Sequence, residues 1–77
     1  MSGLTAVLFH APTGQYVHNV EDWTLTTDRR DAQSFEPDEA ADVLLTYKRV
    51  SYMRFRRHRT ADWPLRFYVA GWTVVPQ

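Results

Sequence analysis

The sequence predicts a single α+β domain over residues 1–77, with an antiparallel sheet of about five strands in the order β-β-β-α-β-β and one main helix packed on one face. Three observations support this prediction. The segment 35–49 has the apolar spacing and end charges of a helix, and short β-prone runs lie on both sides of it. With 77 residues, the chain has enough material for one hydrophobic core and no second one.

The segment 35–49 is expected to form the helix against which the sheet packs. Pro37 suits the first helical position, because its missing N–H would have no partner there. Charges that complement the helix dipole lie near both ends: Asp38, Glu39, Lys48 and Arg49. An apolar stripe at three- and four-residue spacing is expected to face the sheet: Ala40, Ala41, Leu44, Leu45 and Tyr47. Polar positions are left to face water: Asp38, Asp42, Thr46 and Arg49.

The segments 4–10 and 15–20 are predicted to pair as a hairpin around a turn at 11–14, where Pro12 fixes one dihedral angle and Gly14 can adopt a positive φ. A four-residue loop places His10 opposite Gln15 and Phe9 opposite Tyr16. One face of the hairpin then carries Thr5, Val7, Phe9, Tyr16, His18 and Val20. Because this face is the more aromatic, it is expected to pack against the helix. The other face carries Leu4, Ala6, Leu8, His10, Gln15, Val17 and Asn19.

The stretch between the hairpin and the helix is predicted to hold a short strand and one helical turn. The strand covers 23–26, with Trp23 and Leu25 on one side. The segment 27–33 is too short for a stable helix, and Thr27 or Asp28 is expected to cap a single turn there. Ala32 and Phe35 should point inward and fix the entry to the main helix.

Two strands are predicted after the helix. The segment 50–59 has a β-branched start and closely spaced aromatic residues, without a polar stripe of helical period. The segment 65–75 is apolar on both faces, which is typical of a central strand. Gly71 within it indicates a bulge or a close backbone approach, beneath Tyr47 or Trp23.

The composition excludes several classes of protein. No cysteine is present, so neither a disulfide framework nor a thiolate zinc site can form. The N-terminal apolar run is too short for a signal peptide or a membrane span, which favours a cytoplasmic protein that does not enter a membrane.

No catalytic or metal-binding motif is found, and the chain is expected to be non-catalytic, without a cofactor or a metal ion. The predicted register places His10 and His18 on opposite faces of the hairpin, where they cannot share a metal ion. The serines Ser2, Ser34 and Ser51 have no nucleophile-elbow or phosphate-loop context.

The charges are distributed unevenly along the chain. Residues 1–42 hold eight carboxylates and two arginines, whereas residues 43–77 hold seven cations and one carboxylate, although the net charge is zero. The acidic half is expected to bind a basic surface of a partner protein through Glu21, Asp22, Asp28, Asp31, Glu36, Asp38 and Glu39. Two simpler roles for these charges stay open: acidic residues complement the helix dipole, or the two halves neutralise each other within one chain or across a homodimer.

The basic segment provides the alternative binding surface. Basic side chains interleaved with aromatics suit RNA or single-stranded DNA, and the candidate residues are Tyr52, Arg54, Arg56, Arg57 and Arg59. The competing interpretation is an edge strand whose charges discourage pairing with other chains, or which pairs with the acidic half.

The first half of the chain also carries a frame of short motifs: Gly14-x-Tyr16-Val17, Trp23-Thr-Leu-Thr-x-Asp28, Asp31-Ala32-Gln33-x-Phe35 and Glu39-Ala40-Ala41. This frame resembles small accessory proteins encoded by bacteriophages and mobile elements, among them the anti-CRISPR proteins. The resemblance implies a non-enzymatic inhibitor in the host cytoplasm, whose acidic residues dock on the basic surface of a Cas effector complex and block target binding or nuclease recruitment. Because nucleic-acid mimics are usually acidic overall, the basic segment 52–59 argues against pure mimicry and leaves steric blocking open.

Overall fold

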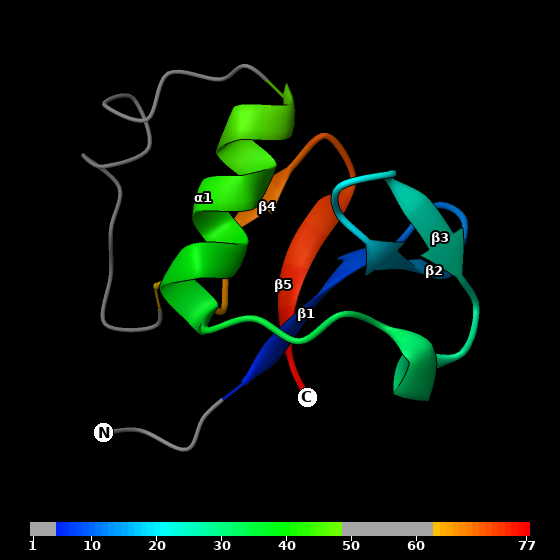
Figure 1. Cartoon of the computed structure of the whole chain (residues 1–77). Helices are drawn as coiled ribbons and strands as arrows, with labels where there is room; N and C mark the ends of the chain where they lie inside the picture. The colour runs from blue at the N-terminus through cyan, green and yellow to red at the C-terminus, as the bar shows by residue number, and fades with distance from the viewer. Residues whose placement is uncertain (1–4, 49–62) are drawn as a thin grey trace.

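The computed structural model describes residues 5–48 and 63–77, which build one antiparallel sheet backed by one α-helix (Figure 1). In chain order the elements are β1 (Ala6–His10), β2 (Gln15–Asn19), β3 (Thr24–Thr26), the 3-10 helix η1 (Arg29–Asp31), α1 (Pro37–Lys48), β4 (Tyr68–Val69) and β5 (Trp72–Pro76). The five strands lie in the order β3-β2-β1-β5-β4. The predicted α+β class, with the order β-β-β-α-β-β and one main helix, is confirmed.

The helix α1 begins at Pro37, as predicted, and places small and aliphatic residues on its inner side. Its buried residues are Ala40, Ala41, Leu44 and Leu45. The acidic residues Asp38 and Asp42 are exposed, as the spacing predicts. Tyr47 differs from the prediction, since its side chain is 44% exposed and does not belong to the buried stripe.

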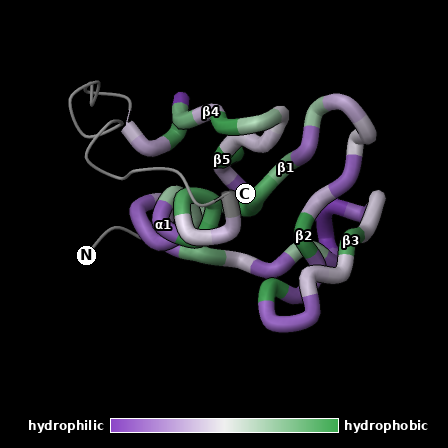
Figure 2. Tube along the Cα trace, turned by 90° about the horizontal axis from the view of Figure 1, so that it is seen from above, coloured by the Kyte–Doolittle hydropathy of each residue, from purple (hydrophilic) through white to green (hydrophobic). Residues whose placement is uncertain are grey.

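The helix packs on the face of the sheet opposite to the predicted one. Figure 2 shows α1 on one side of the curved row of strands. The buried cluster that includes the helix contains the alternate β1 residues Ala6 and Leu8, whereas Val7 is buried outside it. The prediction from aromatic content is therefore wrong. Small and aliphatic residues allow the helix to approach the sheet, while Phe9 and Tyr16 pack against each other on the other face, with ring centroids 4.9 Å apart.

The central strands have a defined register. The hairpin pairs Phe9 with Tyr16 and His10 with Gln15, as predicted. The last strand β5 pairs with β1, so that Leu8 lies opposite Val74. The two ends of the described chain therefore meet in the middle of the sheet.

The segment predicted as one strand over 65–75 is a hairpin of β4 and β5. Val69 pairs with Trp72 across the two-residue turn at Ala70 and Gly71, both of which have positive φ, 52° and 87°. The alternating apolar pattern continues through this turn because both arms are sheet strands. The predicted bulge is thus a turn, whereas the predicted close approach at Gly71 is present, with His10 and Pro12 as the nearest neighbours in place of Tyr47 or Trp23. A Cβ atom at Gly71 would lie 3.0 Å from Nε2 of His10. The strand predicted at 50–59 lies outside the described residues.

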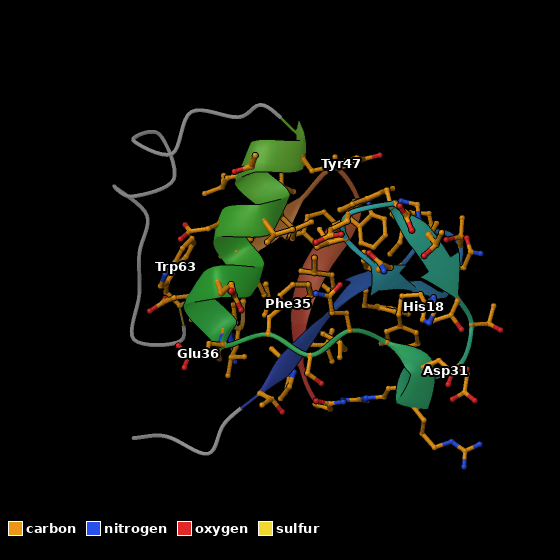
Figure 3. The ribbon with its side chains drawn as sticks, viewed as in Figure 1. His18, Asp31, Phe35, Glu36, Tyr47 and Trp63 are labelled. Atoms are coloured by element: carbon orange, nitrogen blue, oxygen red, sulfur yellow. The ribbon has the colours of Figure 1, made fainter. Side chains whose placement is uncertain are left out.

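The segment between β3 and α1 is anchored to the sheet by backbone hydrogen bonds. Asp28 caps η1, as predicted, since its side chain accepts a hydrogen bond from the backbone N–H of Arg30 at 2.9 Å. Phe35 and Ala6 exchange two backbone hydrogen bonds of 2.8 and 2.9 Å, so the chain passes alongside β1 before the helix begins. Phe35 is buried in the cluster that α1 shares with the sheet, and Figure 3 shows it beside the segment that leads into α1, which agrees with its expected role at the helix entry.

Candidate functional site

A groove lies between α1 and the turn that joins β2 to β3. Its volume is about 300 Å³. We call it the α1–turn groove, and its lining residues are Val20, Trp23, Glu39, Asp42, Val43, Thr46 and Tyr47. Two lining residues come from the turn and five from the helix, so the groove exists only where these elements meet.

The aromatic part of the groove is a stacked pair of rings. Trp23 and Tyr47 lie with their ring centroids 3.6 Å apart and their planes inclined by 11°. The edge of Trp72, in the buried cluster, contacts Trp23 at a centroid distance of 5.5 Å and an angle of 66°. Figure 3 shows Tyr47 at the C-terminal end of α1, on the side of the β2–β3 turn. The stack therefore links the groove to the core of the domain.

The turn holds Trp23 in a backbone conformation that most residues avoid. Its φ is 52°, in the left-handed region that costs a non-glycine residue about 1–3 kcal/mol. The side-chain oxygen of Asn19 accepts hydrogen bonds from the backbone N–H groups of Glu21 at 2.9 Å and Asp22 at 3.4 Å. The side-chain oxygen of Gln33 accepts a hydrogen bond of 2.8 Å from the N–H of Val20. These bonds fix the turn and keep the indole against Tyr47.

Two carboxylates lie at the rim of the groove. Glu39 and Asp42 are three residues apart on α1, so they are neighbours on one side of the helix, and both are exposed. In the described part of the chain, the salt bridge found joins Arg30 to Asp28 at 3.5 Å, and neither rim carboxylate has an ion-pair partner there. Apolar walls beside two exposed carboxylates suit a ligand that is both apolar and cationic.

The structure distributes the predicted acidic residues over several elements. Glu39 lines the groove, and Glu21 and Asp22 lie in the turn between its lining residues Val20 and Trp23. The remaining four predicted residues lie elsewhere: Glu36 and Asp38 at the start of α1, and Asp28 and Asp31 at η1. Glu36 and Asp31 are well separated in Figure 3.

Sequence reasoning missed most of the groove. Trp23 was expected in a strand and Tyr47 in the buried stripe, whereas both form the stack. Two signals could have identified the site. Asn19 precedes the break in the strand pattern at Glu21 and Asp22. Asparagine side chains commonly form hydrogen bonds with the backbone of such turns. In addition, Glu39, Val43 and Tyr47 recur every four residues along one side of the helix.

The alternative nucleic-acid residues Tyr52, Arg54, Arg56, Arg57 and Arg59 lie outside the described residues. In the part that is described, carboxylates outnumber basic residues eight to four. Arg29 contacts the backbone oxygen of Pro76 through its guanidinium, so it is engaged with β5. The described surface therefore has an excess of negative charge, which favours a cationic ligand.

Within residues 5–48 and 63–77, no group of three or more histidine or acidic side chains is placed to hold a metal ion. In the same part of the chain, no helix has the length and apolar character that crossing a bilayer requires. Comparison with known proteins gives no match to this chain among family models, curated proteins or solved structures.

Proposed function

We propose that this chain is a non-catalytic, protein-binding inhibitor that docks the α1–turn groove and the neighbouring carboxylates on a basic surface of its partner. The sequence resemblance gives the specific form of the proposal: a phage-encoded anti-CRISPR protein that acts in the host cytoplasm. It would bind a CRISPR–Cas effector complex and block target binding or nuclease recruitment. The observation that supports protein binding best is the stacked Trp23–Tyr47 pair beside the carboxylates of Glu39 and Asp42, which have no ion-pair partner among the described residues.

Aromatic anchors of this kind commonly supply much of the energy of a protein interface. Tryptophan and tyrosine are enriched among the residues whose truncation costs most binding energy. Here Tyr47 is 44% exposed, and the hydrogen bonds of Asn19 and Gln33 hold the turn that carries Trp23. A surface that is already ordered loses little conformational entropy when it binds.

The charges support a basic partner. Among the eight carboxylates of the described residues, seven are exposed, and Asp28 is half-buried and caps η1. The helix dipole accounts for acidic residues in the first turn of α1, such as Asp38. It accounts less well for Asp42, which lies in the second turn, or for Glu21 and Asp22. Grooves that hold nucleic acid are rich in arginine and lysine, and exposed carboxylates would be attracted to them.

A phage infection assay tests the proposal. The chain is expressed in bacterial strains that each carry one active CRISPR–Cas system, and the plaquing efficiency of a targeted phage is measured. We expect plaquing to recover with one system, whose tagged effector complex should then retain the chain in stoichiometric amount. If no system is inhibited and no effector complex retains the chain, the anti-CRISPR form of the proposal is wrong.

Two charge-matched double variants test whether the partner docks on the α1–turn groove. Glu39→Gln with Asp42→Asn removes two carboxylates from the groove, whereas Asp31→Asn with Glu36→Gln removes two from other parts of the surface. We expect the first pair to weaken capture by the effector at least about tenfold and the second by less than about threefold. Equal weakening by both pairs would indicate general charge attraction instead of docking through the groove.

Two alternatives from the sequence remain predictions. A nucleic-acid-binding module predicts a mobility shift with RNA or single-stranded DNA that weakens with salt and with Arg56→Ala. A homodimer held by opposite charges predicts a dimer in sedimentation that dissociates as the salt concentration rises.

A further inference from the structure

We propose that the α1–turn groove binds the side chain of one arginine of the partner, which lies next to an apolar residue in the partner's own sequence. This inference rests on the proposed function and specifies which chemical group the groove recognises. The aliphatic part of the arginine would lie against the apolar walls, and its guanidinium would bind Glu39 and Asp42 at the rim. The structural basis is the placement of two carboxylates next to a pair of stacked rings.

The size and walls of the groove fit an arginine side chain beside an apolar residue. Its volume of about 300 Å³ lies at the lower end of the range for ligand-binding pockets, about 300–1,000 Å³. The valines of the turn and of the helix, Val20 and Val43, add apolar surface to the two rings. Arginine and lysine bury their methylene groups against such surfaces and keep the charged end near water.

The polar groups favour arginine over lysine. Glu39 and Asp42 lie one helical turn apart, and Thr46 follows one turn after Asp42 along the groove. These side chains offer several oxygen acceptors in a row. A guanidinium is planar and has five N–H donors in a fixed arrangement, whereas an ammonium is a compact and strongly hydrated charge. Arginine can therefore bind both carboxylates at once and still lie flat against an apolar wall.

The groove is also fixed before a ligand arrives. Trp23 contacts Tyr47 on one side and Trp72 on another, and the turn is held by Asn19 and Gln33. Fixed walls let a short segment bind without ordering the protein, so that even a peptide with one arginine should give measurable binding.

An NMR titration of the 15N-labelled chain of residues 1–77 tests the inference. The probes are three acetylated and amidated peptides, Ala-Leu-Arg-Ala and its versions with citrulline or lysine in place of arginine. Citrulline keeps the shape of arginine and lacks its charge. We expect the arginine peptide to shift the indole N–H signal of Trp23 and the amide signals of 39–47 in a saturable way. The citrulline peptide should bind about tenfold more weakly than the arginine peptide, and the affinity of the lysine peptide should lie between these two.

The two charge-matched pairs of variants provide the controls. Glu39→Gln with Asp42→Asn should reduce the affinity for the arginine peptide about tenfold and remove its advantage over citrulline. Asp31→Asn with Glu36→Gln should leave both affinities within about twofold of those of the natural chain. These positions are exposed, and the dispersion of the amide spectrum checks that each variant stays folded.

Three outcomes would overturn the inference: equal affinity for the arginine and citrulline peptides, shifts that map away from the groove, or no saturable shift. Its failure can be told apart from failure of the proposed function. If effector capture depends on Glu39 and Asp42 but the arginine peptide does not bind, the docking surface stands and the arginine inference is wrong. If the arginine peptide binds the groove but no CRISPR–Cas system is inhibited, the arginine site stands and the anti-CRISPR form of the proposed function is wrong.

Discussion

Trp23 and Tyr47 stack with their ring centroids 3.6 Å apart, and this contact joins the β2–β3 turn to the C-terminal end of α1. The residues are far apart in sequence, one before the helix begins and the other near its end. The contact fixes the position of the turn relative to the helix and thereby forms the α1–turn groove. Disrupting it should affect both the stability of the domain and the shape of the groove.

The coupling between the two rings can be measured with a double-mutant cycle. Trp23→Leu and Tyr47→Leu, alone and together, should give a coupling free energy of about 0.5–1.5 kcal/mol in urea unfolding. Phe9 lies on the other face of the sheet, so the effects of Trp23→Leu and Phe9→Leu should add to within about 0.5 kcal/mol. A coupling near zero for the first pair would show that the stack does not stabilise the domain.

Gln33 is expected to stabilise the β2–β3 turn, although it lies 13 residues after Val20 in the sequence. Gln33→Leu removes the acceptor of the Val20 N–H, and loss of that partner should lower the free energy of unfolding by about 1–3 kcal/mol. Hydrogen exchange of the Val20 amide should become faster. Gln33→Glu is the matched control, because its carboxylate can accept the same hydrogen bond. Equal destabilisation by both variants would contradict this role.

The turn between β4 and β5 offers a stabilising substitution. Ala70 has a φ of 52°, a conformation that costs an ordinary residue about 1–2 kcal/mol and that asparagine tolerates better. Ala70→Asn should therefore raise the free energy of unfolding by up to about 1 kcal/mol in chemical denaturation. A lower stability would mean that the turn is not strained at this residue.

Gly71 should not tolerate a side chain. A Cβ atom there would lie 3.0 Å from Nε2 of His10 and 3.1 Å from Cγ of Pro12, and φ is 87°. Gly71→Ala should lower the free energy of unfolding by about 1–3 kcal/mol. Gly14→Ala is the control: its φ is also positive, at 71°, but no atom lies within 4 Å of the added carbon. We expect Gly14→Ala to cost clearly less, and an equal cost would show that crowding at His10 has no effect.

Leu44 tests the packing of the helix on the sheet. Its side chain is fully buried, so Leu44→Ala should destabilise the domain by about 2–5 kcal/mol. Leu44→Met nearly conserves the volume and should cost less than about 1.5 kcal/mol. Thr46→Ala, at an exposed position of the same helix, should change stability by no more than about 0.5 kcal/mol. A small effect of Leu44→Ala in urea unfolding would contradict the position of the core.

Local signals in the sequence predicted much of the fold. Pro37 and the acidic residues after it predicted where α1 begins, and Asp28 predicted the cap of η1, because both effects depend on neighbouring backbone groups. The register of Phe9 with Tyr16 followed from the length of one loop. Such features act over a few residues, so a single sequence contains them.

Other features depended on contacts between distant segments. The hydrophobic pattern of the hairpin fits either face, and the close approach of Ala40 and Ala41 selected the face with Ala6 and Leu8. The continuous pattern over 65–75 likewise concealed a turn at Ala70 and Gly71. Alternation shows which side chains share a face, but it does not show where a strand ends or what covers it.

The sequence by itself determined the fold class, the start of the helix, the pairing of the first hairpin and the excess of acidic residues before and within the helix. Only the tertiary structure decided which carboxylates lie beside an apolar groove. Charge is a property of each residue, whereas the groove requires Trp23 from a strained turn and Tyr47 from the end of the helix to meet. That meeting depends on the packing of the whole helix on the sheet, which no local stretch of the chain encodes.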